Sequence, residues 1–563
     1  MSARHRVVIL GGGPAGLAAA FGLSETAELR ERYEVTVYQV GWRAGGKCST
    51  GRAGPAQRIE QNGTHYLFGC YDNSFAIARG AYDALAQSGV GGFGSYDDAF
   101  LARNLLVLKQ FFDGKWHNWP IEVPSNPIEP GTRTGPLRPV DYLSMILQQM
   151  IEAIAGWRVL SEVQPSTPFR RGRRGCLPRA LRPIGRLVDR AIDHIGLALL
   201  HDALRAAHAL REHGHALEEA KRAIEAACRE VRERAWWLLG PYTRTHLEAN
   251  RGCTLIDFAC TIVIGLLVDD VLEPGGLAAI DRYDFREWLE RHGAHELTID
   301  APFVMTWYDA IAAYDGGDPA RPDSSAGVAL HAICRANFEA KGAFAYQMRA
   351  EAGETLIAPL FECLRRRGVR FRFFHRVWDV VPGENGIEEI EVEQQVQLKS
   401  GDPDSYEPFT EVKGYKAWPA EPLWDQVADA GAVRGHDLES FYTTWRGARR
   451  RLRQGEDFDT VVLALPVDSL RYYCRRIIES RPEWRAMVEN VDGVETQTVR
   501  LWFAPTLEGL GWDLGPPILS TYAKPFSTWE DNGDLVQFEN WPAGQKPHPR
   551  LFTWLPGRMN RRS

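Results

Sequence analysis

The stretch Val7-Val8-Ile9-Leu10-Gly11-Gly12-Gly13-Pro14-Ala15-Gly16 decides the fold at the start of this 563-residue chain. Four consecutive apolar residues suit a strand that is buried on both faces, as in a parallel sheet. A Gly-x-Gly-x-x-Gly turn follows at once and opens a helical stretch, which we expect to run to about Arg32. A second apolar strand, Val35-Thr36-Val37-Tyr38, completes a β-α-β unit. The segment therefore predicts an α/β domain of the Rossmann type.

The glycines of this turn are placed where a bound dinucleotide needs them. Gly11 allows the tight turn, Gly13 lets the backbone approach a pyrophosphate, and Gly16 lets the helix pack closely on the strand. Pro14 and Ala15 fall in the first helical turn, whose free N–H groups and dipole stabilise a phosphate. The alternative is a Gly-rich turn without a ligand. The strand before the turn, the helix after it and the second strand favour dinucleotide binding.

The end of the second strand is the expected place for a ribose contact, and an acidic residue usually stands there. This chain has Gln39, which can accept one hydrogen bond through its carbonyl oxygen but brings no charge. We predict that Gln39 contacts the ribose. The alternative is that Gln39 is a loop residue and that the ribose is held elsewhere.

A second glycine-rich turn, Gly41-Trp42-Arg43-Ala44-Gly45-Gly46-Lys47, follows the second strand directly. Glycines at this place let the backbone approach a cofactor longer than the one that a simple nicotinamide-binding domain holds. The second turn therefore favours FAD over NAD, with Arg43, Gly45, Gly46 and Lys47 as further cofactor-binding residues.

Both turns together resemble the flavin-containing amine oxidase and phytoene desaturase superfamily. The stretch Arg58-Ile59-Glu60-x-x-Gly63-x-His65, followed by Phe68-Gly69-x-Tyr71, is more similar to its phytoene desaturase and hydroxysqualene dehydroxylase-like branch. The resemblance implies FAD as the cofactor. It also implies a hydride transfer between flavin N5 and a C–H bond of an apolar, isoprenoid-like substrate.

Two later segments resemble the same superfamily. Residues 353–379 are similar to its helix-glycine-strand segment, in which the backbone of a valine contacts adenine, and Val377 stands at the matching position. Residues 459–466 are similar to its third cofactor-side strand. Arg43 is implied as a contact of the flavin phosphate or ring, against the alternative of a solvated surface arginine. His65 is implied to line the flavin ring and is the candidate catalytic residue, against the alternative of a structural histidine.

One departure from the superfamily concerns the reaction. Relatives that oxidise amines carry a lysine near flavin N5, and the matching strand here is Thr496–Phe503, with Thr498 near the lysine position and no lysine in the strand. The resemblance thus favours C–H oxidation. The alternative functions are an amine or amino-acid oxidase, or a truncated chain with impaired flavin binding and no catalysis.

A second departure concerns the end of the chain. The superfamily closes its flavin site with a C-terminal glycine-rich strand and helix, and nothing after Phe503 resembles that segment. We expect either that the chain is truncated or that residues 504–563 fold back and complete the site in another way.

The pattern of elements predicts an FAD-binding domain that is interrupted by insertions. We assign residues 1–110, 341–400 and 456–480 to the FAD-binding domain and residues 111–340 to an inserted, largely helical substrate domain. Residues 401–455 are predicted as a substrate-side insertion, and residues 481–563 as a substrate-side sheet. The fold class is α/β, with a mixed substrate domain.

Composition limits the partners. A net charge of −7 gives no reason to expect nucleic acid as a partner, and the nine cysteines show neither CxxC pairs nor zinc spacing, so we expect no metal. Such cysteines are typical of reduced core thiols, which predicts a cytoplasmic location. The apolar run Phe258–Val268 is too short to span a bilayer, which needs about 20 residues. It is predicted as a core helix, with a substrate tunnel as the alternative.

The segment Arg170–Arg190 is the strongly basic part of the chain, with eight arginines between apolar residues. It is predicted as a solvated loop and helix start. The alternative is a membrane-surface patch where a lipid substrate enters, which would make the protein peripheral to the membrane.

Overall fold

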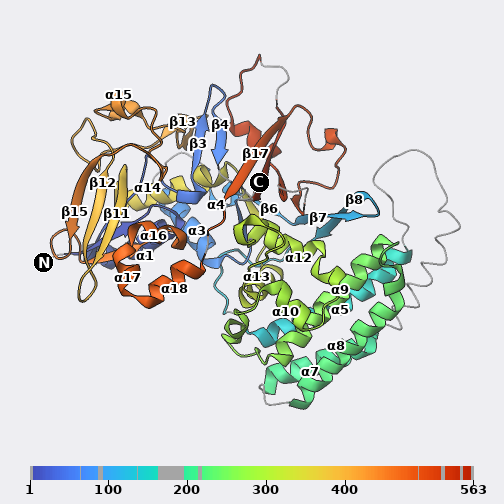
Figure 1. Ribbon diagram of the computed structural model, residues 1–563. Helices are drawn as coiled ribbons and strands as arrows, with labels where there is room; N and C mark the ends of the chain where they lie inside the picture. The colour runs from blue at the N-terminus through green and yellow to red at the C-terminus, as the bar shows by residue number, and fades with distance from the viewer. Residues whose placement is uncertain are drawn as a thin grey trace.

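The computed structural model describes residues 4–61, 63, 65–86, 93–135, 137–162, 196–213, 218–312, 314–491, 493–521, 526–544 and 549–558. An α/β part carries the N-terminus, a bundle of helices lies at the opposite side, and a mixed sheet lies between them (Figure 1). The segment Arg170–Arg190 lies outside the described residues, so its proposed membrane contact stays a prediction.

A four-stranded parallel sheet forms the centre of the α/β part. Its strand order is β10 (Arg370–Arg372), β2 (Tyr33–Tyr38), β1 (His5–Leu10) and β16 (Thr460–Leu463). The two faces of β1 enter different cores: Val7 and Ile9 pack with helix α1 (Pro14–Leu23), whereas Val8 and Leu10 pack on the opposite side. Burial on both faces explains why β1 is apolar throughout, and the predicted α/β class is confirmed.

Two predicted elements are each divided in the structure. The helix expected to reach Arg32 ends at Leu23, where the Ser24 hydroxyl donates to the Ala20 carbonyl at 2.7 Å. A second helix, α2 (Ala27–Arg32), begins after Thr26, which caps it. The alternating pattern of residues 369–381 predicts one strand, but the structure has two, β10 and β11 (His375–Pro382), which lie in different sheets. Phe374 separates them with a φ of +60°. Its N–H donates to the Gly41 carbonyl at 2.7 Å.

Strand β11 begins an antiparallel sheet that covers the even-numbered face of β1. It pairs with β12 (Ile387–Gln394), which pairs with β15 (Ala448–Arg453). A small hairpin of β13 (Thr410–Val412) and β14 (Tyr415–Ala417) and helix α15 (Ala430–Val433) lie in the segment between β12 and β15. Helices α16 (Leu470–Tyr473), α17 (Arg475–Ser480) and α18 (Pro482–Asn490) follow β16.

A six-stranded mixed sheet joins the C-terminal part to residues 105–122. Its order is β17 (Thr496–Phe503), β20 (Leu551–Arg558), β19 (Thr528–Asp531), β18 (Ile518–Ser520), β7 (Leu105–Phe112) and β8 (Lys115–Glu122). Between this sheet and the parallel sheet lie the ribbon of β3 (Thr50–Ala53) and β4 (Arg58–Gln61), and a three-stranded sheet of β5 (Tyr66–Phe68), β9 (Ala345–Met348) and β6 (Phe100–Arg103). The associated helices are α3 (Asp72–Ala86), α4 (Tyr96–Ala99) and α14 (Ala358–Arg366).

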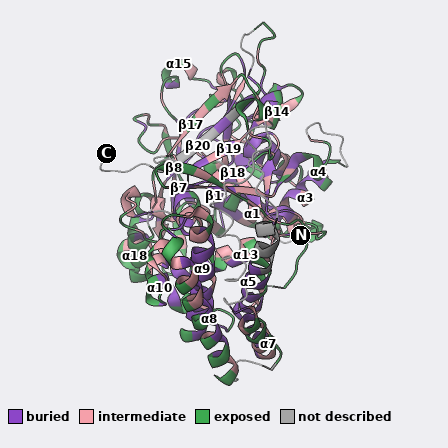
Figure 2. Ribbon diagram, turned by 90° about the vertical axis from the view of Figure 1, so that its right-hand side faces the viewer, coloured by how far each residue is buried: buried purple, intermediate pink, exposed green. Residues whose placement is uncertain are grey.

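The helical part has one large apolar core. Its helices are α5 (Pro139–Glu162), α7 (Leu197–His213), α8 (Glu218–Leu239), α9 (Leu247–Val268), α10 (Phe285–Arg291), α11 (Glu296–Ile299), α12 (Pro302–Thr306) and α13 (Ala326–Phe338). Helix α9 is longer than the apolar run Phe258–Val268 that predicted it. By length and composition alone, it could span a membrane. However, 78% of its most apolar window is buried inside the protein. Figure 2 shows it among the other helices, which favours the core helix over the tunnel. The domain boundaries given above stay a prediction.

Candidate dinucleotide-binding and active site

The two glycine-rich turns lie against each other. The Gly45 N–H donates to the Gly12 carbonyl at 2.8 Å, and a Cβ atom on Gly46 would lie 3.2 Å from the Gly13 Cα. Gly45 and Gly46 have φ angles of +110° and +54°, which glycine adopts without strain. The structure thus brings together two motifs that are about 30 residues apart, as one continuous backbone surface.

The glycines of the first turn differ in how much space surrounds them. A Cβ on Gly16 would lie 1.9 Å from the Gly11 carbonyl oxygen, so helix α1 and the turn touch backbone to backbone. A Cβ on Gly13 would meet nothing nearer than the Gly46 Cα at 3.8 Å. Pro14 and Ala15 are exposed at the start of α1. Open space therefore lies where the helix N-terminus could hold a phosphate.

Gln39 is buried and already bonded within the turn. Its Oε1 accepts a hydrogen bond from the Gly12 N–H at 2.7 Å, and its Nε2 donates to the Val40 carbonyl at 2.8 Å. The side chain therefore holds the first turn against the end of β2. This arrangement favours the alternative in which the ribose is held elsewhere, and a ribose contact by Gln39 stays a prediction.

Arg43 is bonded to two other parts of the chain. Its guanidinium forms a bidentate ion pair with Glu439, with the shortest contact, from Nη2 to Oε2, at 2.7 Å, and it donates from Nη1 to the Thr50 carbonyl at 3.0 Å. Its side chain is 17% exposed. These bonds argue against a solvated surface arginine, and a contact with the flavin phosphate or ring stays a prediction. Burial raises the pKa of Glu439, and the bonds from Arg43 oppose that rise.

His65 lies beside the second glycine turn. A hydrogen bond with the Lys47 backbone raises the pKa of its ring, but the larger effect is burial, which lowers that pKa. The ring is therefore neutral at pH 7. Its Nδ1 is buried and has no hydrogen-bond partner among the residues that the structure describes. A buried ring nitrogen without a partner is uncommon, and a ligand or an ordered water could supply the missing bond.

Val377 lies on β11 at the edge of a cavity of about 800 Å³. Its side chain packs with Val8, Leu10 and Tyr38, so the apolar part serves the core. The cavity is rich in arginine and aromatic side chains, and the Arg449 guanidinium lies 3.8 Å from the centre of the Trp378 ring. Three carboxylates, of Asp379, Glu391 and Glu479, also line the cavity, so its charges are mixed, and an adenine contact at Val377 stays a prediction.

A network of buried charges beside the second turn was not predicted. Arg52 and Glu354 form an ion pair of 2.9 Å in which both side chains are 1% exposed, and the Thr50 hydroxyl donates to the same carboxylate at 3.0 Å. Next to them, Gln61 donates to Glu351 at 2.5 Å. Glu351 has a φ of +65°, which is rare outside glycine. Charged residues inside the apolar stretch 343–361 are the sequence signal that could have indicated this network.

Residues 533–541 fold back onto the β3–β4 ribbon. The Phe538 carbonyl accepts a bond from Arg52 at 2.9 Å, and Glu539 accepts bonds from the Ile59 N–H at 3.0 Å and the Trp502 indole at 3.0 Å. Trp502 lies on β17, where Arg500 donates to the Ile59 carbonyl at 2.8 Å. Thr498 shares this face of β17 by alternation. The C-terminal region is therefore bonded to the β3–β4 ribbon through several hydrogen bonds.

Comparisons with known proteins agree with the first turn. A family model described as an NAD(P)-binding Rossmann-like domain matches residues 9–80. No curated protein matches the chain.

Solved structures resemble it only weakly. One is an oxidoreductase from Methanosarcina mazei, with a TM-score of 0.44, 10% identity and coverage of 99% of this chain and 80% of that chain. Another is wild-type putrescine oxidase bound to putrescine, with a TM-score of 0.39, 11% identity and coverage of 99% and 76%. Likenesses with such low TM-scores carry no argument about activity. Residues 9–80 of this chain, with the β-α-β unit and the glycine turn described above, are thus similar to an NAD(P)-binding Rossmann-like domain.

Proposed function

We propose that this protein is an FAD-dependent oxidoreductase that transfers a hydride between a C–H bond of an apolar, isoprenoid-like substrate and flavin N5. The observation that carries the proposal is the contact between the two glycine turns, with open space at Gly13 and at the start of α1. A simple nicotinamide site needs one such turn, and a second turn in register suits a longer cofactor. When bound, the flavin supplies the hydride acceptor.

The residues of the chain would bind and orient the cofactor. The first turn of α1 would hold the pyrophosphate, and the backbone at Val377 would contact the adenine. Gly45, Gly46 and Lys47 would border the flavin half. His65, neutral because burial lowers its pKa, would offer its buried Nδ1 to the ring or the substrate. Arg43 would act indirectly, by holding the second turn to Glu439.

The same surroundings support C–H chemistry. Thr498 stands where an amine-oxidising relative would have a lysine, so this strand offers no amine that could act as a base. Residues 533–541 pack on the β3–β4 ribbon and would exclude water from that side of the site. Fold-back of the C-terminal region onto the ribbon is therefore part of the proposal.

The substitution Gly13→Ala tests the cofactor site with little effect on folding. The new Cβ would have no protein atom within 3.8 Å, but it would occupy the approach to the helix N-terminus. We expect FAD to bind at least about tenfold more weakly, as measured by flavin absorbance after equilibrium dialysis. The matched control is Gly22→Ala, at an exposed position of the same helix with nothing within 4 Å. Equal FAD affinity in both variants would place the cofactor elsewhere.

The reaction class needs its own measurement. With the FAD-loaded protein, simple amines and amino acids should release no hydrogen peroxide above background. Under anaerobic conditions, an isoprenoid hydrocarbon should reduce the bound flavin, with about one flavin reduced per chain. Loss of the visible flavin absorbance measures this reduction. Peroxide release with an amine would instead assign the protein to the oxidases.

A further inference from the structure

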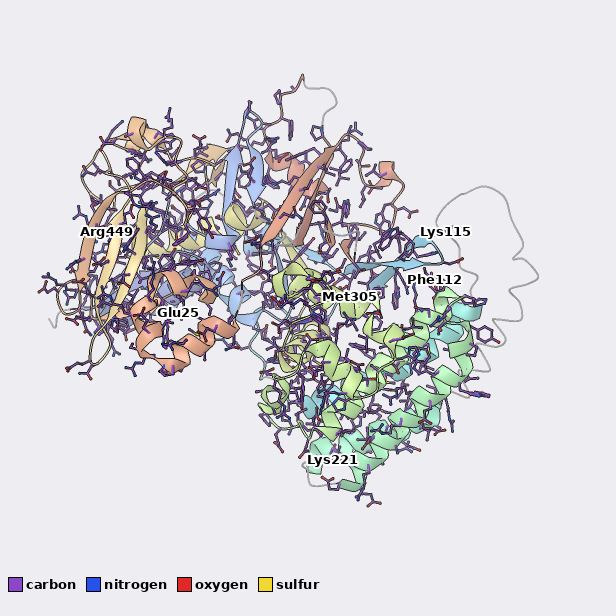
Figure 3. The ribbon with its side chains drawn as sticks, viewed as in Figure 1. Glu25, Phe112, Lys115, Lys221, Met305 and Arg449 are labelled. Carbon is purple, nitrogen blue, oxygen red and sulfur yellow. The ribbon has the colours of Figure 1, made fainter. Side chains whose placement is uncertain are left out.

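A cavity of about 710 Å³ lies between the β7–β8 hairpin and the helical part, away from the residues discussed so far. The hairpin forms one wall, and α11, α12 and the beginning of α9 form the other. Figure 3 labels Phe112 on the hairpin side and Met305 on the helical side. The volume falls in the range of about 300–1,000 Å³ that is usual for small-molecule sites. The apolar lining residues are Phe111, Phe112, Trp116, Leu297, Ala301, Pro302 and Met305.

Most polar side chains in the lining are already bonded to their neighbours, and Asp113 is exposed in the hairpin turn. Gln110 donates to Asn250 at 2.9 Å and accepts from Arg251 at 3.0 Å. The Thr521 hydroxyl accepts from the Lys109 N–H at 3.0 Å and donates to the Lys109 carbonyl at 2.7 Å. Further bonds are Lys109 to Asn118, Arg286 to Asp300, Tyr314 to Asp309 and Arg244 to Glu296. Most of the exposed lining is apolar, so an apolar ligand would cover it while these bonds stay intact.

We propose that this cavity binds the hydrocarbon part of an uncharged small molecule. Burying the exposed apolar lining gains free energy roughly in proportion to the area covered, with no polar group left unpaired. The site lies outside the residues proposed to hold FAD, so the proposal goes beyond the proposed function and does not depend on flavin.

Two local features support a binding site. Phe111 and Trp116 are 61% and 50% exposed at the rim, and their ring centres lie 5.4 Å apart. They are held by a tight turn in which Asp113 and Gly114 have φ angles of +47° and +72°, as in the rigid two-residue hairpin loops. On the other wall, α12 continues into a π-helix, Trp307–Ile311, a form that is frequent at functional sites. Asp309 in this turn also lines the cavity.

The test uses the uncharged dye Nile red, whose fluorescence rises and shifts to the blue in apolar surroundings. The full-length protein should bind one dye per chain, and the C15 isoprenoid alcohol farnesol should displace it, while charged putrescine and ATP should not. Met305→Arg, which fills the cavity with a charged side chain, should weaken dye binding at least about tenfold. The matched control is Val328→Arg, because Val328 is an apolar residue of α13 that is 54% exposed elsewhere.

A second variant distinguishes a loss of binding from a folding defect in Met305→Arg. Phe111→Ser removes an exposed ring at the rim, so the variant should fold normally, as circular dichroism would show. Its affinity for the dye should still fall by about threefold or more. Equal dye affinity in Met305→Arg, Phe111→Ser and Val328→Arg would overturn the proposal. Displacement by putrescine or ATP in place of farnesol would overturn it as well.

Discussion

The parallel sheet and the six-stranded mixed sheet are both assembled from distant segments, but different forces specify them. In the parallel sheet, β1 enters two apolar cores, and residues 7–10 are all buried. The mixed sheet has alternating exposure along β8 and β17. Polar side chains contribute to its contacts with the rest of the molecule: Gln347 on β9 donates to the Asn532 side chain at 2.7 Å and to the Asp531 carbonyl of β19 at 2.9 Å.

This difference determines how each region should respond to change. Apolar packing is non-directional, so the parallel sheet depends on shape, above all where backbones touch. Buried polar networks depend on every partner being present, because a group left unpaired in low dielectric is costly. The parallel sheet should therefore lose stability through steric overlap, whereas the polar networks should lose stability when one hydrogen-bonding partner is removed.

The largest effect is expected on the parallel-sheet side, from Gly16→Ala. The new Cβ would lie 1.9 Å from the Gly11 carbonyl oxygen and 3.2 Å from an Ile9 methyl group, so the backbone must shift. We expect a loss of at least about 4 kcal/mol in the free energy of unfolding, measured by urea denaturation. Gly22→Ala on the same helix should instead be neutral or gain up to about 1 kcal/mol. Similar stabilities for the two variants would contradict the close contact.

The next largest effect is expected in the buried network, from Arg52→Met. The substitution keeps an unbranched side chain but leaves the Glu354 carboxylate buried without its cationic partner. We expect a loss of about 3 kcal/mol, because removing one member of a buried pair exposes the full desolvation cost of the other. The double variant Arg52→Met with Glu354→Met should recover part of that loss. If the double variant lost the sum of both single effects, the pair would not be coupled.

The same contrast explains what the sequence could predict. Strands β1 and β2 and the first glycine turn follow from apolar runs and glycine spacing within about 40 residues, and these signals are local. The partner of Arg43 could not be predicted, because Glu439 comes from a segment almost 400 residues later that carries no motif. For the same reason, the bonds of residues 533–541 to the β3–β4 ribbon appear only once the chain is folded. The break at Phe374 was not predicted, because apolar and polar residues alternate along 369–381 as they would in one continuous strand.

A pH-dependent effect is expected at the junction of the parallel and antiparallel sheets. Burial lowers the pKa of His375 from 6.5 to about 4, while its Nδ1 bonds to the Phe373 carbonyl at 2.8 Å. The unfolded chain binds a proton as the pH falls below 6.5, whereas the folded chain does so only near pH 4. The stability that the neutral ring contributes is thus complete above about pH 6.5 and is lost as the pH falls toward 4.

Between pH 7 and pH 5 this one group should lower the free energy of unfolding by about 2 kcal/mol. Urea denaturation at several pH values measures the slope, and His375→Phe should flatten it while keeping a ring at the position. A slope that is the same in both proteins would show that other groups govern the pH dependence.

The smallest effect is expected at the start of α2, where the predicted long helix is interrupted. Thr26 has extended backbone angles, and its hydroxyl oxygen accepts a hydrogen bond from the Leu29 N–H at 3.3 Å in an exposed position. Thr26→Ala removes this cap and should cost about 1 kcal/mol in urea denaturation, whereas Thr26→Ser should be nearly neutral because serine caps equally well. A hydrogen bond with Thr26 also helps to lower the pKa of Glu28, so the alanine variant should raise that pKa toward its usual value, as NMR titration would show. If Thr26→Ala changed neither quantity, Ser24 alone would account for the break. The Thr26 cap would then contribute nothing to the free energy of unfolding, although local sequence signals specify the rest of this β-α-β unit.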